Sequence, residues 1–236
     1  MHLVPGIVAT TKVGIAQATK SACGPLAGLA PIGEPTHGRS WAEGCLRFNR
    51  SVLEYLASAQ SIEYVVLASP FSQYVEKEGK FNSNLLRTEG GELVRIEPSA
   101  SVAIERIRAT VSQLRSLGKR VVVVAPPPSS GFDLGRCLEL KASGKLFLGA
   151  DGDACRISTM AYHQRRAPVL QLLAQLPGAT EVNVVSFDDV LCTAKVCETE
   201  LNGVFLYRDV NHLSIDGSRQ LAADMGLVHR LLAAAR

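Results

Sequence analysis

The stretch "RVVVVA", Arg120–Ala125, places five consecutive apolar residues behind a single arginine. Two similar runs flank it along the chain, "YVVLAS" (Tyr64–Ser69) and "VNVVSF" (Val182–Phe187). Continuous apolar character, without alternation, is typical of strands that are covered on both faces of a parallel sheet. "KVGIAQAT" (Lys12–Thr19) is a weaker fourth candidate. These runs predict the strands of a buried parallel sheet.

Helical patterns alternate with these runs. The four predicted helices cover about Ser40–Ala59, Ser101–Leu117, Thr159–Leu176 and Ser214–Ala235. Ser40 and Glu43 have the spacing of a capping box, Gly118 is a natural helix stop, and Ser214 is a natural N-cap. Strands that alternate with helices predict a three-layer, doubly wound α/β fold with right-handed crossovers.

Two long connections interrupt this rhythm, Pro70–Pro98 and Pro126–Ser158. Both follow predicted strands, and the carboxyl ends of parallel strands are where such folds build their sites. The sequence contains no internal repeat and no low-complexity linker. We therefore expect one domain that spans residues 1–236.

Composition excludes several classes of function. The 236 residues carry a net charge of +3, with scattered Lys and Arg and only 6% aromatic residues, so nucleic-acid binding is not expected. Apolar and charged contents of 47% and 20% fit an ordinary globular protein. No apolar run is long enough to cross a bilayer, and "MHLVPGIVATTK" has no features of a secretory signal.

The six cysteines leave two interpretations open. None forms a C-x-x-C pair, and no histidine stands at a ligand spacing from them, so a metal site is not expected. An even number in loop-like sequence fits three disulfides in an oxidising compartment, whereas six free thiols fit an intracellular protein. Chain order suggests the pairs Cys23–Cys45, Cys137–Cys155 and Cys192–Cys197. Disulfides without an export signal suggest that the chain is a piece of a longer protein.

"YRDVNHLSIDGS" (Tyr207–Ser218) places Asp209 three residues before His212. In a Ser-His-Asp triad, the Asp holds one ring nitrogen of the His, and the other nitrogen accepts the serine proton. An Asp at this spacing on a tight turn can reach the ring. A bare D-x-x-H also fits an ordinary turn that leads into a helix.

The wider segment "LYRDVNHLSIDGS" resembles the C-terminal motif of the SGNH (GDSL-type) hydrolases, and more narrowly that of SGNH domains fused to membrane acyltransferase family 3 proteins of the O-antigen acetylase type. Four other segments are similar to that group in the same order: "TKSACGPL" (Thr19–Leu26), "WAEGCLRFNRSVLEYL" (Trp41–Leu56), "YVVLASPFSQYV" (Tyr64–Val75) and "DVLCTAKVCETELNGVFLYRD" (Asp189–Asp209). The resemblance covers most of the chain and implies an SGNH/flavodoxin-like fold.

The resemblance also implies roles for individual residues. His212 would be the general base and Asp209 its orienting partner, while Ser214 would cap the last helix. Gly24 matches the family's oxyanion-hole glycine. The family's asparagine after the third strand is absent, and Ser72, Gln73 or Tyr74 would have to donate in its place.

The family's nucleophile is the Ser of a Gly-Asp-Ser motif at the end of the first strand, and this sequence contains no Gly-Asp-Ser. "MHLVPGI" resembles the helix that follows that motif. We therefore expect the first strand and the serine to lie upstream, together with a membrane acyltransferase domain. Without that strand, sheet edges lose their partners, so we expect the chain alone to be unstable or catalytically silent.

The implied function is O-acyl transfer to, or acetyl-ester hydrolysis on, cell-surface glycans such as lipopolysaccharide O-antigen. The partners would be an acyl donor and a glycan acceptor, in a periplasmic domain that its parent tethers to the inner membrane, without metal or organic cofactor. Two alternatives stay open. One is a non-catalytic glycan-binding or scaffolding domain that has lost its nucleophile, and the other is an intracellular α/β enzyme with free thiols.

Overall fold

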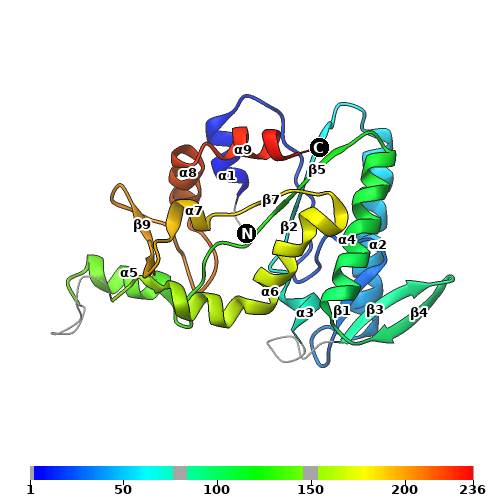
Figure 1. The fold of residues 1–236 in the computed structure, drawn as a ribbon, viewed down its shortest axis with the longest axis horizontal. Coiled ribbons are helices and arrows are strands. Elements are labelled where there is room, and N and C mark those ends of the chain that lie inside the picture. Colours follow the sequence, from blue (N-terminus) through cyan, green and yellow to red (C-terminus); the bar gives the residue numbers. More distant parts are fainter. Residues whose placement is uncertain (1–2, 77–83, 146–153, 236) are drawn as a thin grey trace. The chain divides into compact units, whose positions relative to one another are not determined.

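The computed structural model describes residues 3–76, 84–145 and 154–235, and Figure 1 shows their fold. These residues group into two compact units. Unit 1 consists of Met1–Gln17, Pro126–Arg166 and Ser186–Ala233, and unit 2 consists of Ala18–Ala125, Ala167–Val185 and Ala234–Arg236. A single domain stays a prediction.

The parallel sheet lies in unit 2. Its strands, in the order β2-β5-β7, are β2 (Tyr64–Ala68), β5 (Arg120–Val124) and β7 (Val184–Val185). Tyr64 lies opposite Arg120, and Val123 lies opposite Val184. The four valines of β5 are buried, and Val121 and Val123 pack in the hydrophobic core of unit 2. The three continuous apolar runs are thus confirmed as parallel strands.

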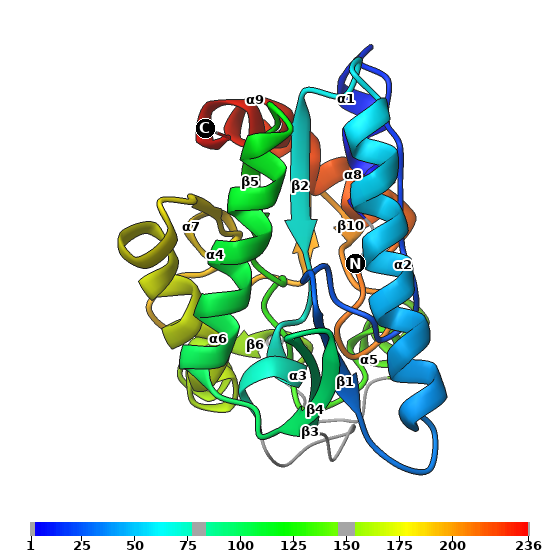
Figure 2. The ribbon, with the colours of Figure 1, turned by 90° about the vertical axis from the view of Figure 1, so that its right-hand side faces the viewer.

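Helices pack along this sheet and complete the core of unit 2 (Figure 2). They are α2 (Arg39–Ser58), α3 (Ser72–Val75), α4 (Ala100–Ser116) and the later turns of α6 (Thr159–Thr180). Helix α4 begins where Ser99 Oγ accepts the backbone N–H of Val102, and it ends before Gly118, whose φ is +74°. That positive φ is the conformation in which glycine ends a helix without strain.

Two local predictions, one at the start of α2 and one near the N-terminus, are wrong. Helix α2 begins after Gly38, so Ser40 lies inside its first turn and no side chain caps it. Glu43 instead pairs with Arg39 at 2.9 Å, which is the neighbour one helical turn away. Residues 12–19 form no strand and are exposed, because no described strand pairs with their backbone.

A small antiparallel sheet in unit 2 was not predicted. It consists of β1 (Leu29–Ile32), β3 (Asn84–Glu89) and β4 (Glu92–Ile96), in the order β1-β3-β4. Gly90 and Gly91 both have positive φ and form the turn between β3 and β4. The sheet packs on α2, where Leu86 and Ala30 are buried with Leu46. It fills part of the long connection that starts at Pro70.

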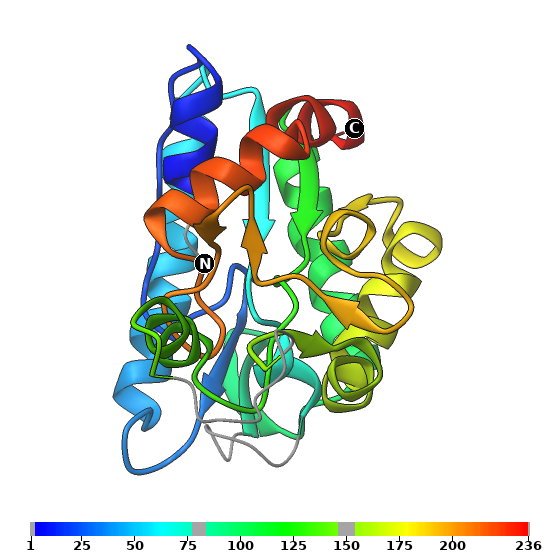
Figure 3. The same cartoon turned by 90° about the vertical axis from the view of Figure 1, so that its left-hand side faces the viewer.

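Unit 1 consists of short elements. They are α1 (Val4–Thr10), α5 (Leu134–Ala142), β6 (Ile157–Ser158), the first turns of α6, α7 (Asp188–Leu191), β8 (Val196–Cys197), β9 (Glu200–Leu201), β10 (Val204–Phe205), α8 (Ile215–Asp224) and α9 (Leu227–Ala234). Helix α1 lies along α8 (Figure 3), where the backbone N–H of Gly6 donates to Ser218 Oγ at 3.2 Å. The single helix predicted for 214–235 is in fact two helices, which separate at Gly226 with its φ of +59°.

All six cysteines form disulfides, and the three pairs are the ones suggested by chain order: Cys23–Cys45, Cys137–Cys155 and Cys192–Cys197. The first pair lies in unit 2 and the other two lie in unit 1. Three disulfides indicate an oxidising, extracytoplasmic environment and weigh against the intracellular alternative.

Across the described ranges, no helix combines the length and the apolar character needed to cross a membrane.

Candidate active site

The Asp209–His212 segment is a tight loop in unit 1. Tyr207 and Leu213 pair across its base, and the backbone N–H of Arg208 donates to the carbonyl oxygen of His212 at 2.9 Å. The buried Tyr207 hydroxyl donates to the carbonyl oxygen of Pro128 at 2.8 Å. These bonds fix both ends of the loop, so the two candidate catalytic side chains start from a defined backbone.

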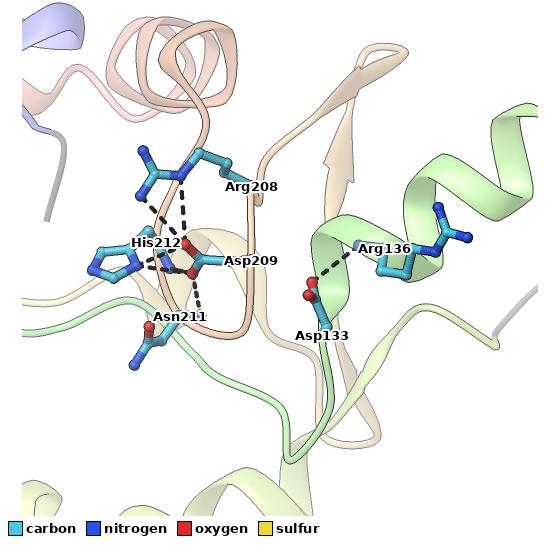
Figure 4. Close-up of polar contacts among 6 residues, drawn as sticks. All are labelled: Asp133, Arg136, Arg208, Asp209, Asn211 and His212. Atoms are coloured by element: carbon cyan, nitrogen blue, oxygen red, sulfur yellow. Dashed lines mark hydrogen bonds and ion pairs between the residues drawn. The ribbon is translucent and has the colours of Figure 1, made fainter. Parts of the chain in front are cut away.

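Within the loop, the Asp209 carboxylate and the His212 ring contact each other directly (Figure 4). His212 Nδ1 lies 2.8 Å from Oδ1 and 2.9 Å from Oδ2 of Asp209. Oδ1 also accepts the backbone N–H groups of Asn211 at 3.1 Å and His212 at 2.9 Å. Arg208 pairs with Oδ2 at 3.3 Å. The carboxylate is therefore held by the same turn that carries the histidine.

These contacts keep Asp209 ionised. Partial burial alone would raise the pKa of its carboxyl group. The backbone N–H groups of Asn211 and His212, together with the His212 ring, outweigh burial and lower this pKa from 3.8 to about 2. An ionised carboxylate can only accept hydrogen bonds, so the hydrogen of a neutral His212 ring lies on Nδ1. Nε2 then carries no hydrogen and can accept a proton. This is the tautomer that a general base needs.

Ser214 caps helix α8, as the sequence predicts. Its Oγ accepts the backbone N–H of Gly217 at 2.8 Å and donates to the carbonyl oxygen of Phe205 at 2.8 Å. Both hydrogen-bonding roles of this hydroxyl are thus used within the fold. The serine next to His212 is a structural residue.

Two residues beside this loop were not singled out by sequence reasoning. Gly135 in the first turn of α5 packs so closely on the loop that an added Cβ would collide with the carbonyl group of Arg208 and lie 3.0 Å from the backbone nitrogen of Asp209. Figure 4 shows this turn, marked by Asp133 and Arg136, beside the loop. Arg208 itself could have been suspected, since an arginine directly before the aspartate is placed to pair with it.

The candidate oxyanion residues Gly24 and Ser72 lie in unit 2. The carbonyl oxygen of Gly24 accepts a hydrogen bond from the buried Asn49 Nδ2 at 2.8 Å. The atoms nearest to where a Gly24 side chain would point belong to Tyr74 and Gln73, with Gln73 Nε2 at 2.9 Å. Of the three donors considered after β2, Gln73 and Tyr74 thus lie against Gly24. Ser72 is half-buried at the start of α3, and the oxyanion role of both Gly24 and Ser72 stays a prediction.

Metal ligation has no support in the part of the chain that the structure describes, where no three His, Cys, Asp or Glu side chains gather in a way that could hold an ion.

The hydrogen bonds to the Asp209 carboxylate, from the backbone N–H groups of Asn211 and His212 and from the His212 ring, give a pH-dependent contribution to stability that can be measured. Because the pKa of Asp209 is lowered on folding, its contribution is fully present above the unfolded pKa of about 4. It is lost as the pH falls through about 2. We expect Asp209→Asn to destabilise the protein at pH 7 and to have a much smaller effect near pH 2. Urea unfolding of both proteins at the two pH values measures this difference, and an equal effect at both would contradict the assignment.

Comparisons with known proteins agree with this fold. The family model described as "SGNH domain (fused to AT3 domains)" matches residues 1–226. A solved structure, the periplasmic domain of a lipopolysaccharide acetyltransferase from Salmonella ser. Paratyphi A, matches with a TM-score of 0.58 at 16% sequence identity. The match covers 97% of this chain and 78% of that one. No curated protein matches the sequence closely enough to count as a relative.

A mixed α/β fold with a parallel sheet, in a chain whose residues 1–226 match the SGNH family model, defines a protein of the SGNH class. Within that class, the chain belongs to the family of SGNH domains that are fused to AT3 acyltransferase domains. The expected family is thereby confirmed.

Proposed function

We propose that this domain transfers acyl groups to, or removes acetyl groups from, cell-surface glycans by a Ser-His-Asp mechanism, and that the serine lies upstream of residue 1. The serine would attack the acyl donor while His212 Nε2 accepts its proton, and the donor's leaving group would depart with that proton as the acyl-serine ester forms. A sugar hydroxyl, or water in an esterase, would then lose its proton to His212 and attack this ester, and the proton would return to the serine oxygen as it leaves. Like the solved Salmonella domain, it would work in the periplasm and be joined to a membrane acyltransferase domain in its parent protein.

The observation that carries the proposal is the hydrogen bond between His212 Nδ1 and the Asp209 carboxylate at 2.8 Å. It supplies two of the three triad functions, namely a base in the correct tautomer and a negative charge that stabilises the imidazolium. Nucleophilic catalysis on an ester needs no redox group, and these residues can manage the proton by themselves.

The sheet supports the upstream location of the serine. Among the described strands, β2 is an edge strand of the parallel sheet, and Val66 at its centre is 37% exposed. Strands of parallel sheets are normally covered on all sides, so an edge with a half-exposed valine favours pairing with one further strand. In the proposed three-layer arrangement, the upstream segment adds that strand and carries the serine at its end.

The proposal is tested with the parent protein, which contains the upstream segment. We expect it to release acetate from a fluorogenic acetyl ester and to move acetyl groups onto purified O-polysaccharide, as detected by a mass increase of the glycan. Substituting the upstream serine with alanine should abolish both reactions. Activity that survives this substitution would refute the mechanism.

A second candidate is a glycan-binding domain without catalysis, which is favoured by the absence of Gly-Asp-Ser from the 236 residues. The two candidates differ in one result. Glycan binding by the parent protein, with no ester turnover under any condition, would support the binding domain.

A further inference from the structure

A shallow hollow in unit 1, distinct from the Asp209–His212 loop, has no role in the proposed proton transfer. Its volume is about 670 Å³, which is in the range of small-molecule sites. The first turn of α6, the first turn of α7 and the loop that follows α7 form its wall. The polar and apolar side chains of its lining include Met160, His163, Gln164, Asp188, Asp189 and Thr193.

The wall of this hollow is held in place by covalent and hydrogen bonds. The Cys192–Cys197 disulfide closes the loop after α7. Thr159 joins the start of α6 to that loop. Its Oγ1 donates to the carbonyl oxygen of Thr193 at 3.0 Å, and its backbone N–H donates to the carbonyl oxygen of Lys195 at 3.0 Å. A surface fixed in this way loses little conformational entropy when a ligand binds.

The chemistry of the lining selects a class of ligand. Asp188 and Asp189 offer carboxylate oxygens, and the Gln164 amide offers both a donor and an acceptor. Met160, which is 68% exposed, adds an apolar surface beside them. Among the described lining residues there is no Lys or Arg, although Asp189 Oδ2 is paired with Arg230 from α9. An anionic ligand would therefore meet the Asp188 carboxylate, whose ion-pair neighbour is His163 at 3.8 Å.

Asp188 is the central acceptor of the hollow. Its carboxylate is about one-third exposed, and burial raises its pKa, while hydrogen bonds from Tyr162 and His163 oppose the rise. The Tyr162 hydroxyl lies 3.2 and 3.3 Å from the two oxygens, and His163 Nε2 is 3.8 Å away. A carboxylate has about four acceptor positions, so these long contacts leave capacity for hydroxyl donors from a ligand.

A buried tyrosine stands at the base of the candidate catalytic loop, in the same unit as the hollow. Tyr207 pairs with Leu213 there and is fully buried. Burial raises the pKa of its hydroxyl, and Tyr162 and Asp188 raise this pKa further. The carboxylate of the hollow thus acts electrostatically on this tyrosine.

We propose that this hollow binds a neutral sugar residue of the glycan acceptor. Adjacent sugar hydroxyls donate to Asp188 and Asp189 and exchange hydrogen bonds with Gln164, and an apolar C–H face of the ring rests on Met160. That this sugar belongs to the glycan acceptor rests on the proposed function. The sugar site itself can be tested without any catalysis.

The test uses ¹⁵N-labelled parent protein and, as probes, the methyl glycosides of mannose, galactose and glucose. We expect millimolar binding, with chemical-shift changes centred on the first turns of α6 and α7. Asp188→Asn and Met160→Ala should each weaken binding about tenfold. Met160 is largely exposed, so its truncation leaves the fold intact even if Asp188→Asn disturbs it. Glu54→Gln, an exposed carboxylate on α2, is the matched control and should bind like the wild type.

Three results would overturn the inference. The first is the absence of chemical-shift changes in the hollow with every glycoside. The second is stronger binding of glucosamine, which would indicate a cation site. The third is stronger binding of glucose 1-phosphate, which would indicate an anion site.

Turnover of a small acetyl ester, measured in parallel, separates this inference from the proposed function. Met160→Ala should lower transfer to glycan about tenfold relative to that turnover, whereas Glu54→Gln should change neither. Sugar binding in a protein without any turnover would refute the proposed function and leave the sugar site standing.

Discussion

Replacing His212 with alanine in the parent protein is expected to lower acetyl-ester turnover by about 10⁴-fold or more. The physical reason is that Asp209 fixes the neutral ring with its hydrogen on Nδ1, so that Nε2 is the base for the serine proton. Without that base, the serine hydroxyl must lose its proton to water. Initial rates with a fluorogenic acetyl ester measure the effect directly.

His229→Ala is the matched control for this substitution. His229 is an exposed histidine on α9 in the same unit, and its loss should leave turnover unchanged. Thermal unfolding of both variants checks that the fold is retained, since half-exposed His212 contributes little to the core. Equal activity of His212→Ala and the wild type would end the triad assignment.

Replacing Gly135 with alanine is expected to lower turnover by about 100-fold or more, although Gly135 takes no part in the chemistry. An added Cβ would collide with the carbonyl group of Arg208, so either α5 or the catalytic loop must move. A displacement of about 1 Å in the loop would misplace the Asp209–His212 pair relative to the serine. Overpacking should also destabilise the protein by about 1–3 kcal/mol.

Gly178→Ala is the control for this second substitution. Gly178 also lies in a helix, α6, but a Cβ there meets no atom within 4 Å. Alanine at this position should preserve turnover and keep or slightly raise stability, because alanine is the better helix former. If Gly135→Ala and Gly178→Ala turn over the ester equally fast, the close contact between Gly135 and Arg208 does not affect activity.

Several features of this protein were predictable because they depend on residues that are close in sequence. The three strands of the parallel sheet follow from unbroken apolar runs, which no exposed element could carry. The helix cap at Ser214 depends on Gly217, which is three residues away. Asp209 and His212 are also three residues apart, so one turn brings them together.

Other features depended on partners that are distant in the chain. Gly90 and Gly91 suggest a turn, but only the pairing of β1 with β3 makes the surrounding residues a sheet. The predicted capping box failed because helix α2 begins one residue before Ser40. Residues 12–19 have a strand-like sequence but no described partner strand, and an extended segment without a partner keeps its backbone bonded to water.

By itself, the sequence determined the parallel strands and the contact between Asp209 and His212, since apolar runs and short spacings act locally. It suggested the disulfide pairs but left free thiols open. Only the tertiary structure decided that Gly135 packs against the candidate catalytic loop and that α6 and α7 line a shallow hollow. These contacts connect segments far apart in the chain, and no spacing in a single sequence encodes such distances. They exist because close packing leaves each side chain only the room that its distant neighbours allow.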